Sequence, residues 1–218
     1  MTEEPGLRQR KKRRTRQALI EAALRLFAEQ GYERTTLHQI AAAADISTRT
    51  FFSYFASKED VVFFDFEPRR LHALAIISDR APGETLSALL RRTVRGITTD
   101  RDTGVDRLFA LAPVRDALVA TVPALQAREL HLTFALQRDL ADALTEVFAG
   151  ELTPLDAMTA IGALSGAQQL VASVVLENGG SPEDLHAAIT RTTDIVLDGL
   201  RRLDGHQEAS DSTTGPGR

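Results

Sequence analysis

The sequence of 218 residues predicts an all-α protein with two helical domains. Apolar residues recur at spacings of three and four residues, which is the period of an amphipathic helix. No sustained alternation of apolar and polar residues marks a half-buried strand. We expect a flexible basic arm over 1–15, a first helical domain over 16–61, a second over 62–203 and a disordered tail over 204–218.

The first predicted helix carries a broad apolar stripe that faces a core. It ends at Gly31, because glycine adopts the left-handed conformation after a helix at little cost. The stripe consists of Ala18, Leu19, Ala22, Ala23, Leu26 and Phe27.

Two shorter helices follow, each opened by a hydroxyl side chain that can cap free backbone N–H groups. Thr35 or Thr36 caps a helix over 37–44. Ser47 then caps a third helix of about two turns over 48–55.

The rest of the chain also shows helical spacing, with proline and glycine between the segments. Ser57 caps the first of these helices. Pro68 and Pro123 fall inside two of the predicted helices, and we expect each to kink or divide its helix. The predicted helices cover residues 58–78, 84–99, 103–111, 114–148, 154–178 and 182–203.

The composition excludes several kinds of chemistry. Without cysteine, the chain has no disulfide, thiol redox centre or thiolate metal site. Its five histidines are scattered, so we expect no metal site. The sequence lacks a glycine-rich phosphate loop and a nucleophile elbow, and we expect no enzymatic activity, catalytic residue or cofactor. It also lacks a secretory leader and an apolar stretch of about eighteen residues, which favours a cytoplasmic protein without a membrane segment.

Charge is unevenly distributed along the chain. Residues 1–58 carry a net charge of +5 within a total of −4, so the remainder is strongly acidic. Seven of the nine residues from Arg8 to Arg16 are basic. A run of charges of this kind is often only a flexible, solvent-exposed N-terminal segment. A basic run next to a domain that binds DNA has a second role open to it, in which Arg13, Arg14 and Arg16 follow phosphates or enter the minor groove, and the three helices that follow this run favour that role.

The three helices up to residue 55 meet the requirements of a helix-turn-helix that reads DNA. Small residues over 41–44 let the second and third helices cross closely, and Phe51 and Phe55 can hold the third onto the first. Short polar and basic side chains on its exposed side fit a major groove, and groups at helix ends can hold phosphates. We predict base contacts from Thr48, Arg49, Thr50 and Ser53, and phosphate contacts from Thr36, Tyr54 and Lys58, and we count the capping Ser47 among the DNA-binding residues.

An ordered series of short motifs runs from Ala18 to Val61. It consists of Ile20-Glu21-Ala22-Ala23, Leu26-Phe27, Gly31-Tyr32, Thr35-Thr36, Ile40-Ala41, Ile46-Ser47, Thr50-Phe51-Phe52-Ser53-Tyr54-Phe55 and Ser57-Lys58-Glu59. This series resembles the N-terminal part of the TetR family of bacterial repressors.

Three positions depart from the commonest pattern of that family. Asp45 stands where a turn glycine is usual, although aspartate tolerates a left-handed backbone. Arg49 stands where a small residue is common. Phe52 stands where a tyrosine usually offers its hydroxyl to a phosphate, so we expect Phe52 to pack against a sugar or a thymine methyl group instead.

The resemblance implies a C-terminal ligand-binding and dimerisation domain whose last two helices form the dimer interface. The residues agree, because the helix over 154–178 carries small side chains and the helix over 182–203 carries apolar ones. These helices could also pack within one subunit. The predicted interface residues are Gly162, Ser165, Gly166, Ser173, Ile189, Val196 and Leu200.

The resemblance also implies three partners: a palindromic operator in double-stranded DNA, a second copy of the chain, and an unidentified small molecule that releases the repressor. Two alternatives remain, an activator and an interaction protein whose basic arm binds RNA or anionic surfaces. The predicted pocket residues, each of which could also be an ordinary core or surface group, are Phe109, Arg128, His131, Phe134, Gln137, Gln168 and Gln169.

Overall fold

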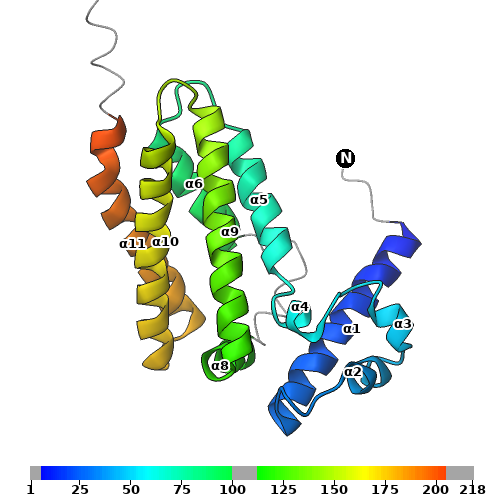
Figure 1. Ribbon diagram of the computed structural model, residues 1–218. Coiled ribbons are helices and arrows are strands. Elements are labelled where there is room, and N and C mark those ends of the chain that lie inside the picture. The colour runs from blue at the N-terminus through cyan, green and yellow to red at the C-terminus, as the bar shows by residue number, and fades with distance from the viewer. Residues whose placement is uncertain (1–5, 100–111, 205–218) are drawn as a thin grey trace, which may run out of the picture. The chain divides into compact units, whose positions relative to one another are not determined.

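The computed structural model describes residues 6–99 and 112–204, and within these ranges every regular element is a helix (Figure 1). The all-α prediction is confirmed. The helices are α1 (Leu7–Gln30), α2 (Leu37–Ala43), α3 (Thr48–Phe51), α4 (Lys58–Val62), α5 (Phe66–Ser78), α6 (Leu86–Thr99), α8 (Ala112–Thr121), α9 (Pro123–Val147), α10 (Pro154–Glu177) and α11 (Pro182–Asp204). The helix predicted over 103–111 lies outside the described residues.

Proline marks helix starts in this chain. The helix predicted over 58–78 is divided, because the backbone turns after α4 and Phe66 N donates to Phe63 O at 3.1 Å. Pro68 then lies in the first turn of α5, where the missing N–H needs no partner. Pro123 separates α8 from α9, as expected.

The N-terminus of α1 corrects one prediction. The helix begins at Leu7, so the expectation of a flexible arm over 1–15 is wrong from Leu7 onward. Arginine, lysine and glutamine are good helix formers, and this run continues directly into the apolar stripe that anchors the helix. Residues 1–5 lie outside the described residues, and so does the predicted tail beyond Asp204, the last residue of α11.

The chain divides into two compact units. Unit 1 comprises residues 1–67 and 101–132, and unit 2 comprises residues 68–100 and 133–218. This division assigns α8 and the start of α9 to the same unit as α1. The predicted boundary after residue 61 had placed both of them in the second domain.

The core of unit 1 forms around α1, which contacts α2, α4 and α8. Burying these apolar side chains removes them from water, and this burial is the main favourable term in folding. The fully buried side chains of this core include Leu19, Ile20, Leu24, Phe27, Ile40, Phe51 and Leu125.

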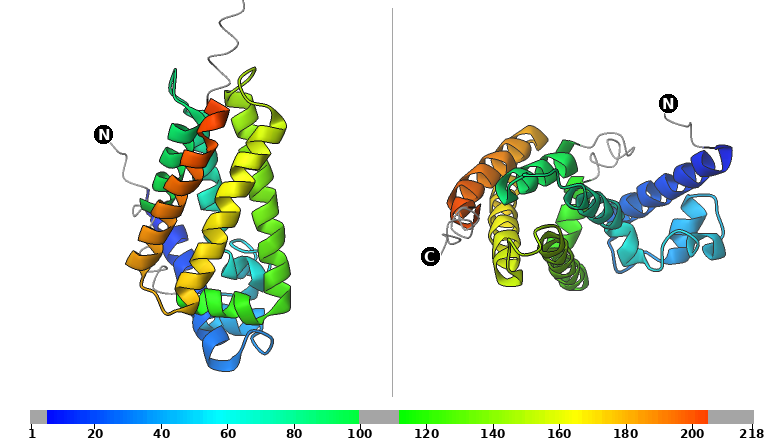
Figure 2. Two further views of the ribbon diagram at one scale, coloured as in Figure 1. Left: turned by 90° about the vertical axis from the view of Figure 1, so that its left-hand side faces the viewer. Right: turned by 90° about the horizontal axis from the view of Figure 1, so that it is seen from above.

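Unit 2 has a separate core. Figures 1 and 2 show α10 and α11 side by side, and α11 also contacts α6. The buried side chains include Ile77, Leu89, Leu90, Leu144, Phe148, Leu164 and Leu197.

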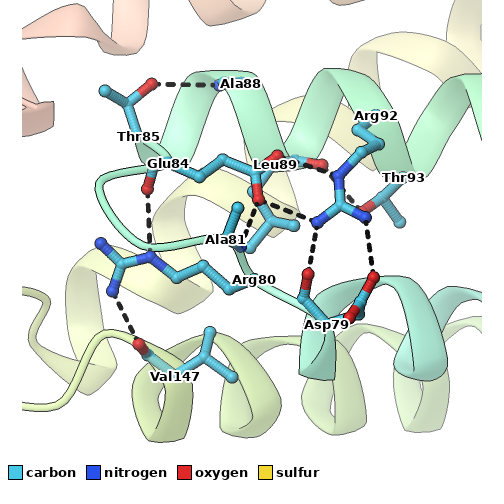
Figure 3. A network of polar contacts seen from close by, with 10 residues as sticks. All are labelled: Asp79, Arg80, Ala81, Glu84, Thr85, Ala88, Leu89, Arg92, Thr93 and Val147. Carbon is cyan, nitrogen blue, oxygen red and sulfur yellow. Dashed lines mark hydrogen bonds and ion pairs between the residues drawn. The ribbon is translucent and has the colours of Figure 1, made fainter.

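A charged network closes the turn between α5 and α6 in unit 2 (Figure 3). Arg92 binds both carboxylate oxygens of Glu84, with Nε–Oε1 at 2.9 Å and Nη2–Oε2 at 2.8 Å. Arg80 Nη1 donates to the Val147 carbonyl at 2.7 Å. The hydrogen bond from Arg92 is the main reason that the pKa of Glu84 lies below its usual value.

This network predicts a pH-dependent contribution to stability. Because the pKa of Glu84 is lowered in the folded state, the ionised carboxylate stabilises the fold above the ordinary pKa of 4.5. The contribution disappears as the pH falls through the lower folded value. At pH 7, Glu84→Gln should reduce the free energy of unfolding by about 1 kcal/mol, since solvent screens part of this pair.

Denaturant unfolding at pH 7 and below pH 4 measures the effect. The deficit of Glu84→Gln should shrink in acid, while the exposed Glu29→Gln control should stay close to the native protein at both pH values. An equal deficit at both pH values would contradict the role of the Glu84 charge.

Candidate nucleic-acid interface

Helix α2 begins with a reciprocal capping box. Thr36 Oγ1 accepts a hydrogen bond from Gln39 N at 3.2 Å, and Gln39 Oε1 accepts one from Thr36 N at 2.8 Å. Thr36 is therefore the cap, and the exposed end of α2 is rigidly defined. Thr35 is buried instead, and its hydroxyl donates to the Gly31 carbonyl at 2.8 Å.

The turn between α2 and α3 depends on Asp45. Its φ of 56° lies in the left-handed region, and no other non-glycine residue in the described ranges has a positive φ. Asp45 N donates to Ala42 O at 3.1 Å, and Ile46 N donates to Ala41 O at 3.0 Å. The expectation that aspartate permits this turn is confirmed.

Helix α3 is shorter than the two turns predicted. Ser47 caps it, because Ser47 Oγ accepts a hydrogen bond from Thr50 N at 3.1 Å. Its regular part ends at Phe51, after which Ser53 N and Tyr54 N bond three residues back in a tighter turn. Phe55 N still donates to Phe51 O at 3.1 Å, so the helical direction continues to Phe55.

Two faces of this segment differ sharply in burial. Phe51 and Phe55 lie in the core of unit 1. Arg49, Phe52 and Ser53 are exposed on the opposite side. Of the four side chains predicted to face bases, Arg49 and Ser53 are thus exposed together, and Phe52 lies beside them.

The two threonines of α3 that were predicted to contact bases are less accessible to solvent. Thr48 and Thr50 are half-buried, and the Thr50 hydroxyl lies 2.8 Å from Ser47 Oγ. Thr50 therefore takes part in the cap of α3. Tyr54 is also half-buried and packs against the core of unit 1.

Lys58 is tied to Tyr32. Its ammonium donates to the Tyr32 carbonyl at 3.1 Å and lies 4.0 Å from the centre of the Tyr32 ring. The Tyr32 hydroxyl is 2.5 Å from Glu59 Oε1. Burial, and then this hydrogen bond, raise the pKa of Tyr32, which keeps the phenol protonated. These contacts join the start of α4 to the end of α1.

Arg16 is half-buried, and its guanidinium has partners within unit 1. Its Nη2 donates to the Phe64 carbonyl at 2.5 Å, and its guanidinium carbon lies 5.1 Å from the centre of the Phe55 ring. Burial lowers the pKa of Arg16, while Asp65 opposes that shift. Helical spacing explains the partial burial of Arg16, because Arg16 lies on the same face of α1 as the buried Ile20. Arg13 and Arg14 are exposed.

The predicted effector residues have different surroundings within the described parts of the chain. Phe109 lies outside the described residues, and His131, Phe134 and Gln169 are exposed. Gln168 donates to Thr193 Oγ1 at 2.9 Å, and Gln137 donates to Ser165 Oγ at 2.7 Å, which fixes both amides between helices of unit 2.

Unit 1 contains an open cavity of about 280 Å³. Among the residues predicted to bind an effector, Arg128 lines this cavity. Arg128 Nη2 lies 3.4 Å from Asp60 Oδ1. Sequence reasoning missed the aromatic walls, although the run Phe63-Phe64-Asp65-Phe66 was a visible signal. These walls include Tyr54, Phe55, Phe63, Phe64 and Phe66, with Leu132.

The predicted interface residues of α10 and α11 fall into two groups. Gly162, Gly166 and Ser173 are exposed. Val196 and Leu200 pack against the core of unit 2, while Ile189 and Ser165 are half-buried. Ile195 of α11, which the sequence also marked as apolar, is exposed. Sequence reasoning missed the exposed apolar side chains of α10, which are Leu155, Met158, Leu170, Val174 and Leu176.

The different surroundings of the three arginines predict different effects of their removal. Arg16→Ala should reduce the free energy of unfolding by about 1–2 kcal/mol, because the Phe64 carbonyl loses a charged donor and Phe55 loses a stacked cation. Arg13→Ala should have almost no effect on stability. Thermal and denaturant unfolding of both variants measure this contrast. Equal stability of Arg16→Ala and Arg13→Ala would show that Arg16 is not structural.

Known proteins share this architecture and this motif. The family model described as "Bacterial regulatory proteins, tetR family" matches residues 19–63. The HTH-type transcriptional regulator TcmR of Streptomyces glaucescens is 40% identical over 141 residues, which cover 63% of this chain and 62% of TcmR. The chain thus aligns with less than two thirds of that relative. HbdR of Aromatoleum sp. (strain CIB), another HTH-type regulator, is 48% identical over 48 residues, or 22% of this chain and 21% of HbdR.

Two solved structures show the same fold at low sequence identity. A TetR-family regulator from Mesorhizobium loti has a TM-score of 0.53 at 19% identity, with 85% of this chain and 96% of that chain covered. The TetR-family repressor FadR of Thermus thermophilus has a TM-score of 0.50 at 22% identity, with 84% and 94% covered. Together with the capped α2–turn–α3 unit, the family model and these relatives identify residues 19–63 as the N-terminal helix-turn-helix segment of the TetR family of bacterial regulatory proteins.

Proposed function

We propose that the protein is a transcriptional repressor that binds a palindromic operator as a homodimer and leaves it when a small molecule binds. The exposed face of α3 carries this proposal, because Arg49, Phe52 and Ser53 point away from a core that holds Phe51 and Phe55. A rigid helix with short polar and basic groups on its outer face fits the major groove of DNA.

Each part of this surface has a distinct task in the proposal. Thr48, Arg49 and Ser53 face base edges, and Arg49 makes no hydrogen bond or ion pair with another described residue. Phosphates lie against the ends of α2 and α3, near their capping hydroxyls. These phosphate contacts involve Thr36, Ser47, Thr50, Tyr54 and Lys58.

Selection of bound fragments from a random DNA library, with the purified protein at moderate salt, tests the proposed function. The expected product is one palindromic sequence whose half-sites lie about 34–36 Å apart, one helical turn, or a multiple of that spacing. Equal, salt-sensitive retention of all nucleic acids would instead favour a protein whose basic segment binds polyanions without reading sequence.

The exposed cations of α1 should contribute affinity without sequence preference. Replacing both Arg13 and Arg14 by Gln removes four phosphate contacts from the proposed dimer and should reduce the slope of log K against log salt by about 3.6, because each lost phosphate contact lowers it by about 0.9. Arg138→Gln, at an exposed position of α9, should leave the slope unchanged. Fluorescence anisotropy at several salt concentrations measures the slopes. If the double variant and the native protein gave the same slope, Arg13 and Arg14 would not contact phosphates.

The apolar surface of α10 supports the proposed homodimer. By length and composition α10 could cross a membrane, and little of it is buried within the single chain. A second copy would cover its exposed Leu155, Met158, Leu170 and Val174, together with Ile195 of α11. Two helix-turn-helix domains bound to one palindrome also supply sequence specificity that a single small domain lacks.

The glycines of α10 allow a test of this interface. A Cβ atom added at Gly166 meets no atom of its own chain within 4 Å. Gly166→Leu should therefore leave the helical fold intact but disturb close approach by a second α10. Analytical ultracentrifugation should show a dimer for the native protein and a shift of at least tenfold toward monomer for the variant.

Ala127→Leu is the control, since it places the same leucine side chain at an exposed position of α9. It should remain dimeric. Monomeric native protein, or an unchanged dimer of Gly166→Leu, would exclude this interface.

Release by a small molecule completes the proposal. FadR of Thermus thermophilus, a relative in fold, is described in complex with lauroyl-CoA. In this chain the aromatic cavity with Arg128 offers a place for a small effector. Such a ligand must bind a non-operator conformation more tightly than the operator-binding one, because only differential affinity shifts the equilibrium. A regulator of this kind acts in the cytoplasm and needs no catalytic residue or cofactor.

A further inference from the structure

We propose that Phe52 identifies a thymine in each half-site of the operator by direct contact with the C5-methyl group of the base. The inference rests on the proposed DNA-binding function and assigns one element of its sequence specificity. It also decides between the two partners that sequence reasoning left open for Phe52, a sugar and a thymine methyl group.

The exposure of Phe52 is exceptional in its part of the chain. Residues 8–67 are all described, and among their large apolar side chains Phe52 alone is strongly exposed, with 54% of its surface accessible. The neighbouring Phe51 is fully buried. An aromatic ring in water gains free energy when a partner covers it, so its position on the reading face calls for an apolar partner.

The ring of Phe52 is also held in place before any DNA arrives. It meets the ring of Phe51 edge-on, with centroids 5.7 Å apart and planes at 88°. Phe52 N donates to Thr48 O at 3.3 Å. Because Phe51 is fixed in the core, little conformational freedom is lost when Phe52 meets a partner.

The chemistry of the major groove leaves one base as the match for this ring. A phenyl group has no hydrogen-bond donor or acceptor and cannot bind the polar edges of guanine, cytosine or adenine. The C5-methyl group of thymine is the apolar group that the four bases present in that groove. A deoxyribose would also be apolar, but contact with it would not depend on the base.

The position of Phe52 on α3 locates the thymine. Phe52 follows Arg49 by three residues, and side chains at this spacing lie on one face of a helix. Arg49 is exposed and suited to guanine, whose O6 and N7 atoms accept a bidentate pair of hydrogen bonds. We therefore expect the thymine next to the base pair that Arg49 contacts.

Thymine-to-uracil replacement in the selected duplex tests the inference, because it removes only the methyl group. One position per half-site should lose about fourfold in affinity for the native protein, the value expected for one buried methyl-sized group. Phe52→Ala removes this contact from both half-sites, so it should bind the thymine duplex about sixteenfold more weakly or worse, and it should bind the thymine and uracil duplexes equally. Phe52→Leu keeps an apolar side chain and should retain most of the discrimination.

The remaining outcomes overturn the inference in distinguishable ways. Equal loss of affinity by Phe52→Ala for every duplex, with uracil sensitivity retained, would place Phe52 on the DNA backbone. Absence of any uracil-sensitive position would exclude a methyl contact while leaving the proposed function intact. Failure of the native protein to select any duplex would remove the proposed function and the inference together. Circular dichroism and thermal unfolding establish that each variant is folded.

Discussion

Phe51 and Phe55 are buried in the same core as Leu19 and Ile20 of α1, and this burial determines the orientation of α3. With these two rings inside, the helical period turns Arg49 and Phe52 outward. The caps at Thr36 and Ser47 fix where α2 and α3 begin. The surface that we propose to read DNA is therefore a consequence of core packing. It needs no ordering when DNA binds, which lowers the entropic cost of recognition.

Short-range signals explain what could be predicted from the sequence. Thr36, Asp45 and Ser47 act through bonds to residues within five positions along the chain, so their roles were visible as local patterns. The all-α fold followed from apolar spacing for the same reason. The helical state of the basic run was missed because a high charge density was read as a flexible, solvent-exposed segment, although its residues favour helix.

Long-range contacts explain what could not be predicted. The surroundings of Arg16 depend on Phe64, 48 residues away, and those of Lys58 depend on Tyr32, 26 residues away. No local pattern reveals such pairs, so both cations were predicted only as phosphate contacts. In unit 2 the sequence showed the small residues of α10, but which apolar side chains remain exposed depends on how α10 packs against α11.

Amide hydrogen exchange of the protein with and without its selected duplex tests the central claim most directly, since it locates bound DNA along the whole chain. If the capped α2–turn–α3 unit is the reading surface, exchange over residues 36–58 should slow by at least tenfold in the presence of the duplex. The buried turns of α6 in unit 2 should exchange at an unchanged rate. Protection confined to unit 2, with residues 36–58 unaffected, would contradict the claim that this face of α3 binds DNA.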